Sequence, residues 1–252
     1  MIGFFDSGIG GLSIWKEAVR VLPPTDTVYL SDNAFCPYGP KPPAEILERS
    51  IKITDFLLSQ GCSIIVIACN TATAVSIDFL RARYGIPFVG LEPAVKPAAM
   101  GSKNHKIGVL ATHGTLRGRL YQETARRYAR DTEIVVQEVR GWVERVERGE
   151  IDPTPETLAI VREQLSPLLE AHVDSLVLGC THFPFLRKAI EQVAGPSVRL
   201  YDPASAIARR IRQLLAGTPE AGKGQGEHLF YCTGSTAPLA RFGMAALRIE
   251  LM

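Results

Sequence analysis

Two cysteines stand out in this sequence because each follows the same kind of segment. Cys69 lies in the segment IIVIACNTAT, and Cys180 lies in the segment SLVLGCTHFP. In both, an aliphatic run gives way to a small residue, a cysteine and polar side chains that include hydroxyl groups. Runs that are apolar on both faces are typical of buried parallel strands. We therefore expect each thiol at the carboxyl end of a strand, where open α/β sheets bind ligands.

Matched surroundings favour a chemical role for both thiols. A single cysteine after a buried strand is more often a small core residue than a reactive group, but two in the same context favour chemistry. Asn70 and Thr71 follow the first thiol at the start of a predicted helix, where free backbone N–H groups hold a carboxylate and lower the pKa of a thiol. Thr181 and His182 follow the second thiol in the same way, and His182 adds a group that titrates near neutral pH.

Two thiols that face each other across a cleft suit racemisation. One group removes a proton from one face of the substrate carbon and another delivers a proton to the opposite face, since a single base returns the proton to the face it left. Preorganised hydrogen bonds in a closed, dry site must then stabilise the carbanion. No lysine lies in a loop that suggests pyridoxal phosphate, so we expect no cofactor.

The five cysteines show no CxxC spacing, which argues against both a disulfide framework and a zinc site. We therefore expect no bound metal. Free thiols are typical of a reducing cytoplasm, and we expect a strand at the start of the sequence and no signal peptide. No apolar run reaches the roughly 18 to 20 residues of a membrane span. The predicted location is the cytoplasm, with no membrane partner.

A glycine-rich turn from Asp6 to Gly11 follows the first predicted strand. Its glycines let backbone N–H groups approach an anion. The turn does not match GxGxxG, and its acidic residue would repel a phosphate, so a dinucleotide site is disfavoured. Asp6 keeps two interpretations: it assists a thiol or steadies an ammonium group, or it caps the helix that follows.

Two further segments place polar groups near the ends of strands. The loop from Ser31 to Pro43 is too rich in proline and glycine to be regular. Its Tyr38 and Gly39 either bring a phenol and backbone groups to a substrate or form a tight turn with a packing tyrosine. In the second half of the chain, we expect the hydroxyls of Thr112 and Thr115 to face the same cleft.

An internal repeat predicts how these groups come together. The segment IGFFDSGIGG, which begins at Ile2, resembles IGVLATHGTL, which begins at Ile107, and the two cysteine segments recur at nearly the same interval. We therefore expect an α/β protein of two pseudo-symmetric domains with parallel central sheets and the site in the cleft between them. The predicted division gives residues 1–95 and 208–252 to the first domain and 96–207 to the second.

The apolar periodicity predicts alternating strands and helices. Strands are expected near residues 2–5, 28–30, 64–67, 86–90, 106–110, 134–138, 176–178, 198–201 and 229–233. Helices are expected near residues 12–21, 44–60, 72–84, 117–128, 155–171 and 204–215, and from 238 onward, with a flexible link over 217–226.

The composition excludes several classes of function. The 252 residues are 46% hydrophobic and 21% charged, which is ordinary for a folded globular protein. A net charge of +2 gives no electrostatic case for nucleic acid, and the basic run from Arg117 to Arg130 is expected on a solvated helix face. Glu147, in the segment WVERVERG, reads by itself as an exposed helix charge.

Four motifs in this order carry a resemblance to a known family: FDSGIGG, CPYG, ACNTAT and GCTHFP. With them the chain resembles the cofactor-independent glutamate racemases of the aspartate/glutamate racemase superfamily. The resemblance implies that Cys69 and Cys180 are the acid–base pair, with Asp6, His182 and Glu147 in support. It also implies a set of substrate-binding residues, which is Asp6, Ser7, Tyr38, Gly39, Asn70, Thr71, Thr112, Thr115, Thr181 and His182. The implied product is D-glutamate for peptidoglycan, and a homodimer is typical of the family.

Three alternatives belong to different classes. An aspartate or hydantoin racemase would keep both cysteines and change the pocket for the substrate side chain. A cysteine hydrolase would need one nucleophile, a histidine base and an oxyanion hole, which leaves the second thiol unexplained. A non-catalytic binding protein with this fold would be supported by the loss of one thiol, and both are present.

Overall fold

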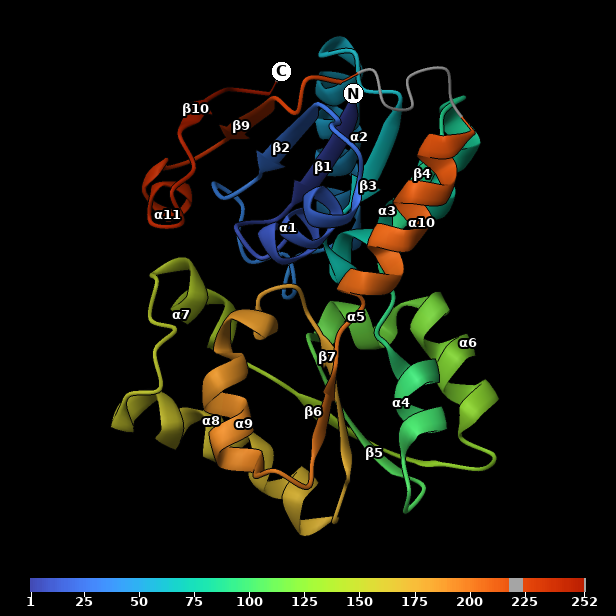
Figure 1. Ribbon diagram of the computed structural model, residues 1–252, viewed down its shortest axis with the longest axis vertical. Coiled ribbons are helices and arrows are strands. Elements are labelled where there is room, and N and C mark those ends of the chain that lie inside the picture. The colour runs from blue at the N-terminus through green and yellow to red at the C-terminus, as the bar shows by residue number, and fades with distance from the viewer. Residues whose placement is uncertain (218–223, 252) are drawn as a thin grey trace.

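The computed structural model describes residues 1–217 and 224–251, which build two parallel β-sheets placed one above the other (Figure 1). The upper sheet has the order β10-β9-β2-β1-β3-β4, and all of its neighbouring strands pair in parallel. Its strands are β1 (Ile2–Asp6), β2 (Thr27–Ser31), β3 (Ile64–Ile67), β4 (Phe88–Gly90), β9 (His228–Cys232) and β10 (Ala246–Arg248).

The lower sheet is smaller and also parallel throughout, in the order β6-β5-β7-β8. Its strands are β5 (Lys106–Ala111), β6 (Glu133–Glu138), β7 (Ser175–Gly179) and β8 (Arg199–Tyr201). The α/β class with two parallel sheets is therefore confirmed. The central strands of both sheets are buried on both faces, as their continuous apolar runs predict.

Helices connect the strands and cover the sheets (Figure 1). They are α1 (Leu12–Val21), α2 (Pro43–Ser59), α3 (Asn70–Arg83), α4 (Val95–Gly101), α5 (His113–Arg117), α6 (Arg119–Tyr128), α7 (Trp142–Glu147), α8 (Pro155–Glu170), the 3-10 turn η1 (Phe183–Leu186), α9 (Arg187–Ala194), α10 (Ala204–Ala216) and α11 (Ala237–Ala240). None of the helices in the described part of the chain has the length and apolar character needed to cross a membrane.

The strand order explains why the site lies at the junction of the two halves. In the upper sheet the chain leaves β1 toward β2 on one side and returns to β3 on the other, so β1 and β3 flank a topological switch point. In the lower sheet β5 and β7 flank the equivalent point. Loops after the strands leave a crevice at such points. Asp6 and Cys69 lie at the first, and Thr112 and Cys180 lie at the second.

Some elements differ from the sequence predictions. The helix expected over 117–128 is interrupted at Gly118, where α5 ends and α6 begins. The helix expected from 238 onward ends at Ala240, and the chain then forms edge strand β10 beside β9. Gly243, with φ of +78°, turns the chain between them, which a helix cannot tolerate. The expected link over 217–226 lies largely outside the described residues.

The predicted domain boundaries remain a prediction. Residues 2–90 and 228–248 supply the strands of the upper sheet, and residues 106–201 supply those of the lower sheet. Helix α10 follows the last strand of the lower sheet and packs against α1 of the upper half (Figure 1). The chain therefore crosses between the halves twice, once near α4 and once near the start of α10.

Candidate active site

A small cavity lies where the two switch points meet. It has a volume of about 20 Å³, which is room for roughly one water molecule. Its lining brings together both cysteines and most of the predicted substrate-binding residues: Ser7, Pro37, Tyr38, Gly39, Cys69, Asn70, Thr71, Thr112, Thr115, Val143, Cys180, Thr181 and His182. Of the other predicted residues, Asp6 lies buried near Cys69, and Glu147 lies behind His182.

Cys69 occupies the N-cap position of α3, directly after β3. Its Sγ accepts a hydrogen bond from the backbone N–H of Ala72 at 3.5 Å and lies 4.0 Å from Ser7 Oγ. Burial raises the pKa of the Cys69 thiol well above its ordinary value, and the nearby Asp6 carboxylate raises it further. The helix N-terminus does lower this pKa, as the sequence predicts, but burial has the larger effect. The thiolate at this position is therefore strongly basic.

Asp6 ends β1 and is fully buried. Its Oδ2 accepts a hydrogen bond from the backbone N–H of Gly11 at 2.9 Å, one residue before α1 begins. Its Oδ1 has no hydrogen-bond partner among the described residues. Burial raises the pKa of Asp6, and the nearby His182 lowers it by less. The helix-cap interpretation of Asp6 is wrong, because Gly11 is the N-cap of α1 and no side chain caps this helix; one oxygen of Asp6 instead anchors the turn through Gly11.

Cys180 begins a chain of polar contacts in the lower half. Its Sγ lies 3.8 Å from Nδ1 of His182, whose Nε2 lies 2.7 Å from Glu147 Oε1. Burial alone would lower the pKa of His182, but its contacts with Cys180, Cys36 and Glu147 raise this pKa well above the ordinary value. Glu147 is largely buried at the end of α7, so the reading of an exposed charge is wrong.

The glycine-rich turn of the upper half makes room for this pair. The backbone N–H of Ile9 donates a hydrogen bond of 2.7 Å to Glu147 Oε1. A Cβ at Gly8 would overlap the Glu147 carboxylate, and one at Gly10 would overlap His182. The turn is therefore glycine-rich because the histidine and glutamate of the other half approach its backbone closely.

Polar side chains from both halves complete the lining. The hydroxyls of Thr71, Thr112 and Thr115 form a row with spacings of 3.0 Å, which crosses from α3 to the end of β5. Asn70 is almost fully buried, and neither atom of its amide group has a hydrogen-bond partner in the described chain. Thr181 accepts a hydrogen bond from Ser13 through its backbone oxygen at 3.2 Å. An unpartnered buried amide is costly, and the amide group of Asn70 can still donate and accept hydrogen bonds in the cavity.

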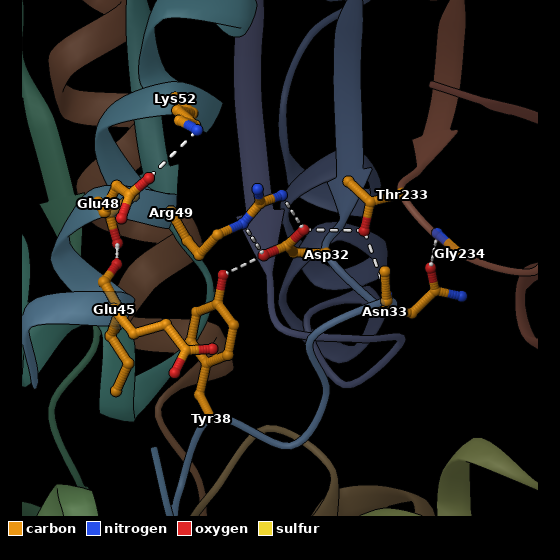
Figure 2. A network of polar contacts seen from close by, with 12 residues as sticks. Asp32, Asn33, Tyr38, Glu45, Glu48, Arg49, Lys52, Thr233 and Gly234 are labelled. Carbon is orange, nitrogen blue, oxygen red and sulfur yellow. Dashed lines mark hydrogen bonds and ion pairs between the residues drawn. The ribbon is translucent and has the colours of Figure 1, made fainter. Parts of the chain in front are cut away.

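A buried ion pair holds in place the loop that carries Tyr38 and Gly39 (Figure 2). Arg49 of α2 holds Asp32 through two hydrogen bonds of 2.6 and 3.0 Å. The same carboxylate accepts hydrogen bonds from the hydroxyls of Tyr38 at 2.5 Å and Thr233 at 2.8 Å. The phenol of Tyr38 therefore bonds to another side chain of the protein, which agrees with the packing alternative given for this tyrosine.

Three residues near the site are not among the predicted site residues. Cys36 lies in the same loop, and its thiol lies close to His182 and Glu147. Asp32 and Arg49 form the ion pair described above. A charged residue on the apolar face of a predicted helix signals a buried partner, and Arg49 lies among Ile46 and Ile53 on that face of α2.

Comparison with known families supports this picture. The family model described as Asp/Glu/hydantoin racemase matches residues 13–211. A curated relative from Methylococcus capsulatus, named glutamate racemase, is 44% identical over 92% of this chain and 86% of its own length.

Solved structures similar to this chain include two glutamate racemases in complex with glutamate. Glutamate racemase from Escherichia coli, solved with L-glutamate and the activator UDP-MurNAc-Ala, is 35% identical with a TM-score of 0.87 and covers 98% of this chain and 97% of its own. Glutamate racemase from Francisella tularensis, solved with D-glutamate, is 27% identical with a TM-score of 0.84 and covers 99% and 97%.

Proposed function

The chain belongs to the Asp/Glu/hydantoin racemase family, and we propose that it interconverts L- and D-glutamate with Cys69 and Cys180 as the two acid–base groups. One observation carries the proposal. The two thiols come from equivalent positions after β3 and β7 and line the same cavity from opposite halves. Glutamate is the substrate because relatives over nearly the whole chain are glutamate racemases.

The reaction needs one thiolate and one thiol at a time. The thiolate removes the Cα proton of one enantiomer, and the thiol on the other side gives its proton to the opposite face of the carbanion. The reverse reaction starts from the product with the roles exchanged. Burial raises the pKa of the Cys69 thiol, which makes its thiolate a strong base. The pKa of the thiol therefore comes closer to the high pKa of the Cα–H group, from which the thiolate removes a proton. The acid and the base are both side chains of this protein.

Each thiol has a neighbour suited to assist it. The carboxylate of Asp6 lies beside the thiol of Cys69. His182 lies beside Cys180, and Glu147 fixes the imidazole from the other side. We propose that Asp6 steadies the substrate ammonium group near the first thiol, and that His182 exchanges a proton with the second thiol.

The remaining polar groups suit an amino acid with two carboxylates. The unpartnered amide of Asn70 and the hydroxyls of Ser7, Thr71 and Thr181 line the cavity. Hydroxyl and amide donors bind carboxylates and stabilise the charge that develops when Cα loses its proton. Gly39, Thr112 and Thr115 complete the binding surface, and Tyr38 contributes its backbone, because its hydroxyl is held by Asp32.

Wider features of the proposal go beyond the site. We propose that the D-glutamate supplies peptidoglycan synthesis in the cytoplasm, where five free thiols stay reduced. We also propose a homodimer. Leu229 on β9 and Leu247 on β10 are exposed by 43% and 64%, and an apolar edge of this kind suits a subunit contact.

Polarimetry tests the activity. The purified protein is incubated with L-glutamate and separately with L-aspartate, without added cofactor. We expect only glutamate to lose its optical rotation, and Cys69→Ser and Cys180→Ser each to lower the rate by a factor of about 10² to 10⁴. Cys62→Ser, a buried thiol outside the cavity, is the matched control and should keep the rate. Unchanged glutamate with the wild-type protein would refute the proposal, and faster loss of rotation from aspartate would favour the aspartate alternative.

A further inference from the structure

A third thiol lies at the edge of the site and has no part in the proposed reaction. Cys36 belongs to the loop between β2 and α2, His182 follows β7, and Glu147 ends α7. One donor atom from each, namely a thiol sulfur, an imidazole nitrogen and a carboxylate oxygen, lies within 4.8 Å of the other two. The three residues come from distant parts of the sequence, which is why CxxC spacing does not reveal them.

These donors fit a metal ion in both chemistry and size. Sulfur, nitrogen and oxygen ligands in this combination bind zinc with bond lengths of about 2.0 to 2.3 Å. In a tetrahedral site such bonds separate the donor atoms by roughly 3.3 to 3.8 Å. The donor separations, which are at most 4.8 Å, therefore need to shrink by about 1.5 Å at most, which side-chain rotations accommodate.

The surroundings leave the donors available. The hydrogen bonds from Ile9 and His182 both involve Oε1 of Glu147 and leave Oε2 unused by either. Gly8 faces the space between the carboxylate and the thiol, since a Cβ there would lie 3.2 Å from Cys36 Sγ. Cys36 and Glu147 each keep a small exposed surface, through which an ion in solvent can reach them.

We propose that Cys36, Glu147 and His182 form a binding site for a thiophilic divalent cation such as Zn²⁺, and that the bound ion reversibly stops racemisation. Coordination displaces the proton of the Cys36 thiol and the proton on the metal-binding nitrogen of His182 to solvent, and it forms a sulfur–metal and a nitrogen–metal bond. The ion also takes the imidazole and carboxylate away from their contact with each other. Cys180 then loses the histidine beside it, so inhibition follows from binding.

Cobalt binding tests the site without relying on activity. Metal-stripped protein is titrated with Co²⁺, whose thiolate complexes absorb in the near ultraviolet, and Zn²⁺ affinity is measured by competition with a chromophoric chelator. We expect one equivalent of Co²⁺ with a sulfur charge-transfer band in the wild type. Cys36→Ser should lose the band and weaken Zn²⁺ binding by more than the roughly 10- to 100-fold that loss of an outer-shell partner costs. Glu147→Gln should weaken it as a second, independent measurement.

Inhibition is measured in the same set of proteins. Zn²⁺ should inhibit the wild type and the Cys62→Ser control, chelator should restore the rate, and Cys36→Ser should racemise glutamate and resist Zn²⁺. Unchanged Zn²⁺ affinity in Cys36→Ser would overturn the site. If Cys69→Ser were the one variant that lost Zn²⁺ binding, the ion would lie between the two reacting thiols, and this result would also overturn the proposed site. The inhibition arm rests on the proposed function, but the Co²⁺ spectrum judges the site even if the protein is not a racemase.

Discussion

At the scale of single residues, the site holds buried polar groups. Their burial destabilises the folded protein, and it also makes these groups more reactive. Asp6 is the clearest case, because its carboxylate is fully buried and one oxygen has no partner among the described residues. The sequence marks these residues as candidates, since they follow strands in recognisable motifs. Their protonation cannot be predicted from the sequence, because burial, which raises the pKa of Asp6 and of Cys69, depends on the assembled core.

Asp6→Asn should make the protein more stable and less active. Burial raises the pKa of Asp6, so the charged form of this carboxylate destabilises the folded protein. This destabilisation is absent below pH of about 4 and grows as the pH rises through the raised pKa. Asparagine keeps an acceptor for Gly11 and removes the buried charge. We expect a gain on the order of 1 kcal/mol in the free energy of unfolding at pH 7 that vanishes near pH 3, measured by urea denaturation. An equal gain at both pH values would contradict this explanation.

At the scale of elements, the glycine turn and the loop after β2 are the parts that position the site. The sequence predicts that β1, β3, β5 and β7 end in functional groups, since their apolar runs are unambiguous. It does not predict which loop a buried ion pair holds in place. The ion pair of Asp32 and Arg49 joins α2 to the loop, and it depends on contacts between residues that no local pattern connects (Figure 2).

Arg49→Met should destabilise the protein by about 3 to 5 kcal/mol, because it leaves the buried carboxylate of Asp32 without its cation. Lys52→Met is the matched control on the same helix, and its ion pair with Glu48 is exposed enough to contribute at most about 1 kcal/mol. Chemical denaturation measures both. Equal destabilisation by the two substitutions would show that the buried pair does not support the loop.

At the scale of the whole molecule, the two halves close over a cavity that is too small for glutamate. Contacts between the halves include the row of threonine hydroxyls and the hydrogen bond from Ile9 to Glu147. The internal repeat predicts two similar sheets that face each other, and both are present. How tightly they close cannot be predicted from either half alone, since the contacts that close the cleft join one half to the other.

Substrate should stabilise the closed molecule. The halves must separate to admit glutamate and then close on it. Because residues of both halves line the cavity, the ligand binds the folded state and not the unfolded chain. At 100 times its dissociation constant, either enantiomer of glutamate should add about 2.7 kcal/mol, which raises the melting temperature by roughly 5 to 10 °C. Aspartate at the same concentration should add less. Equal shifts for glutamate and aspartate in a thermal denaturation series would argue against a pocket matched to glutamate.

The proposed homodimer gives a second prediction at this scale. Sedimentation equilibrium should return about twice the mass of one chain. Leu247→Glu places a charge on the exposed apolar edge and should shift the protein toward the monomer while leaving the fold intact. A wild-type protein that sediments as a monomer at all concentrations would contradict the dimer.

Deuterium incorporation tests the two-thiol reaction most directly. L-Glutamate is treated with the wild-type protein in D₂O, the reaction is stopped early, and the two enantiomers are separated and examined for deuterium at Cα. Because one thiol removes the proton and the other delivers a solvent-derived deuteron, D-glutamate should carry deuterium while the remaining L-glutamate keeps its proton. Deuterium appearing in recovered L-glutamate as fast as in D-glutamate would mean that one base serves both faces, and would contradict the account.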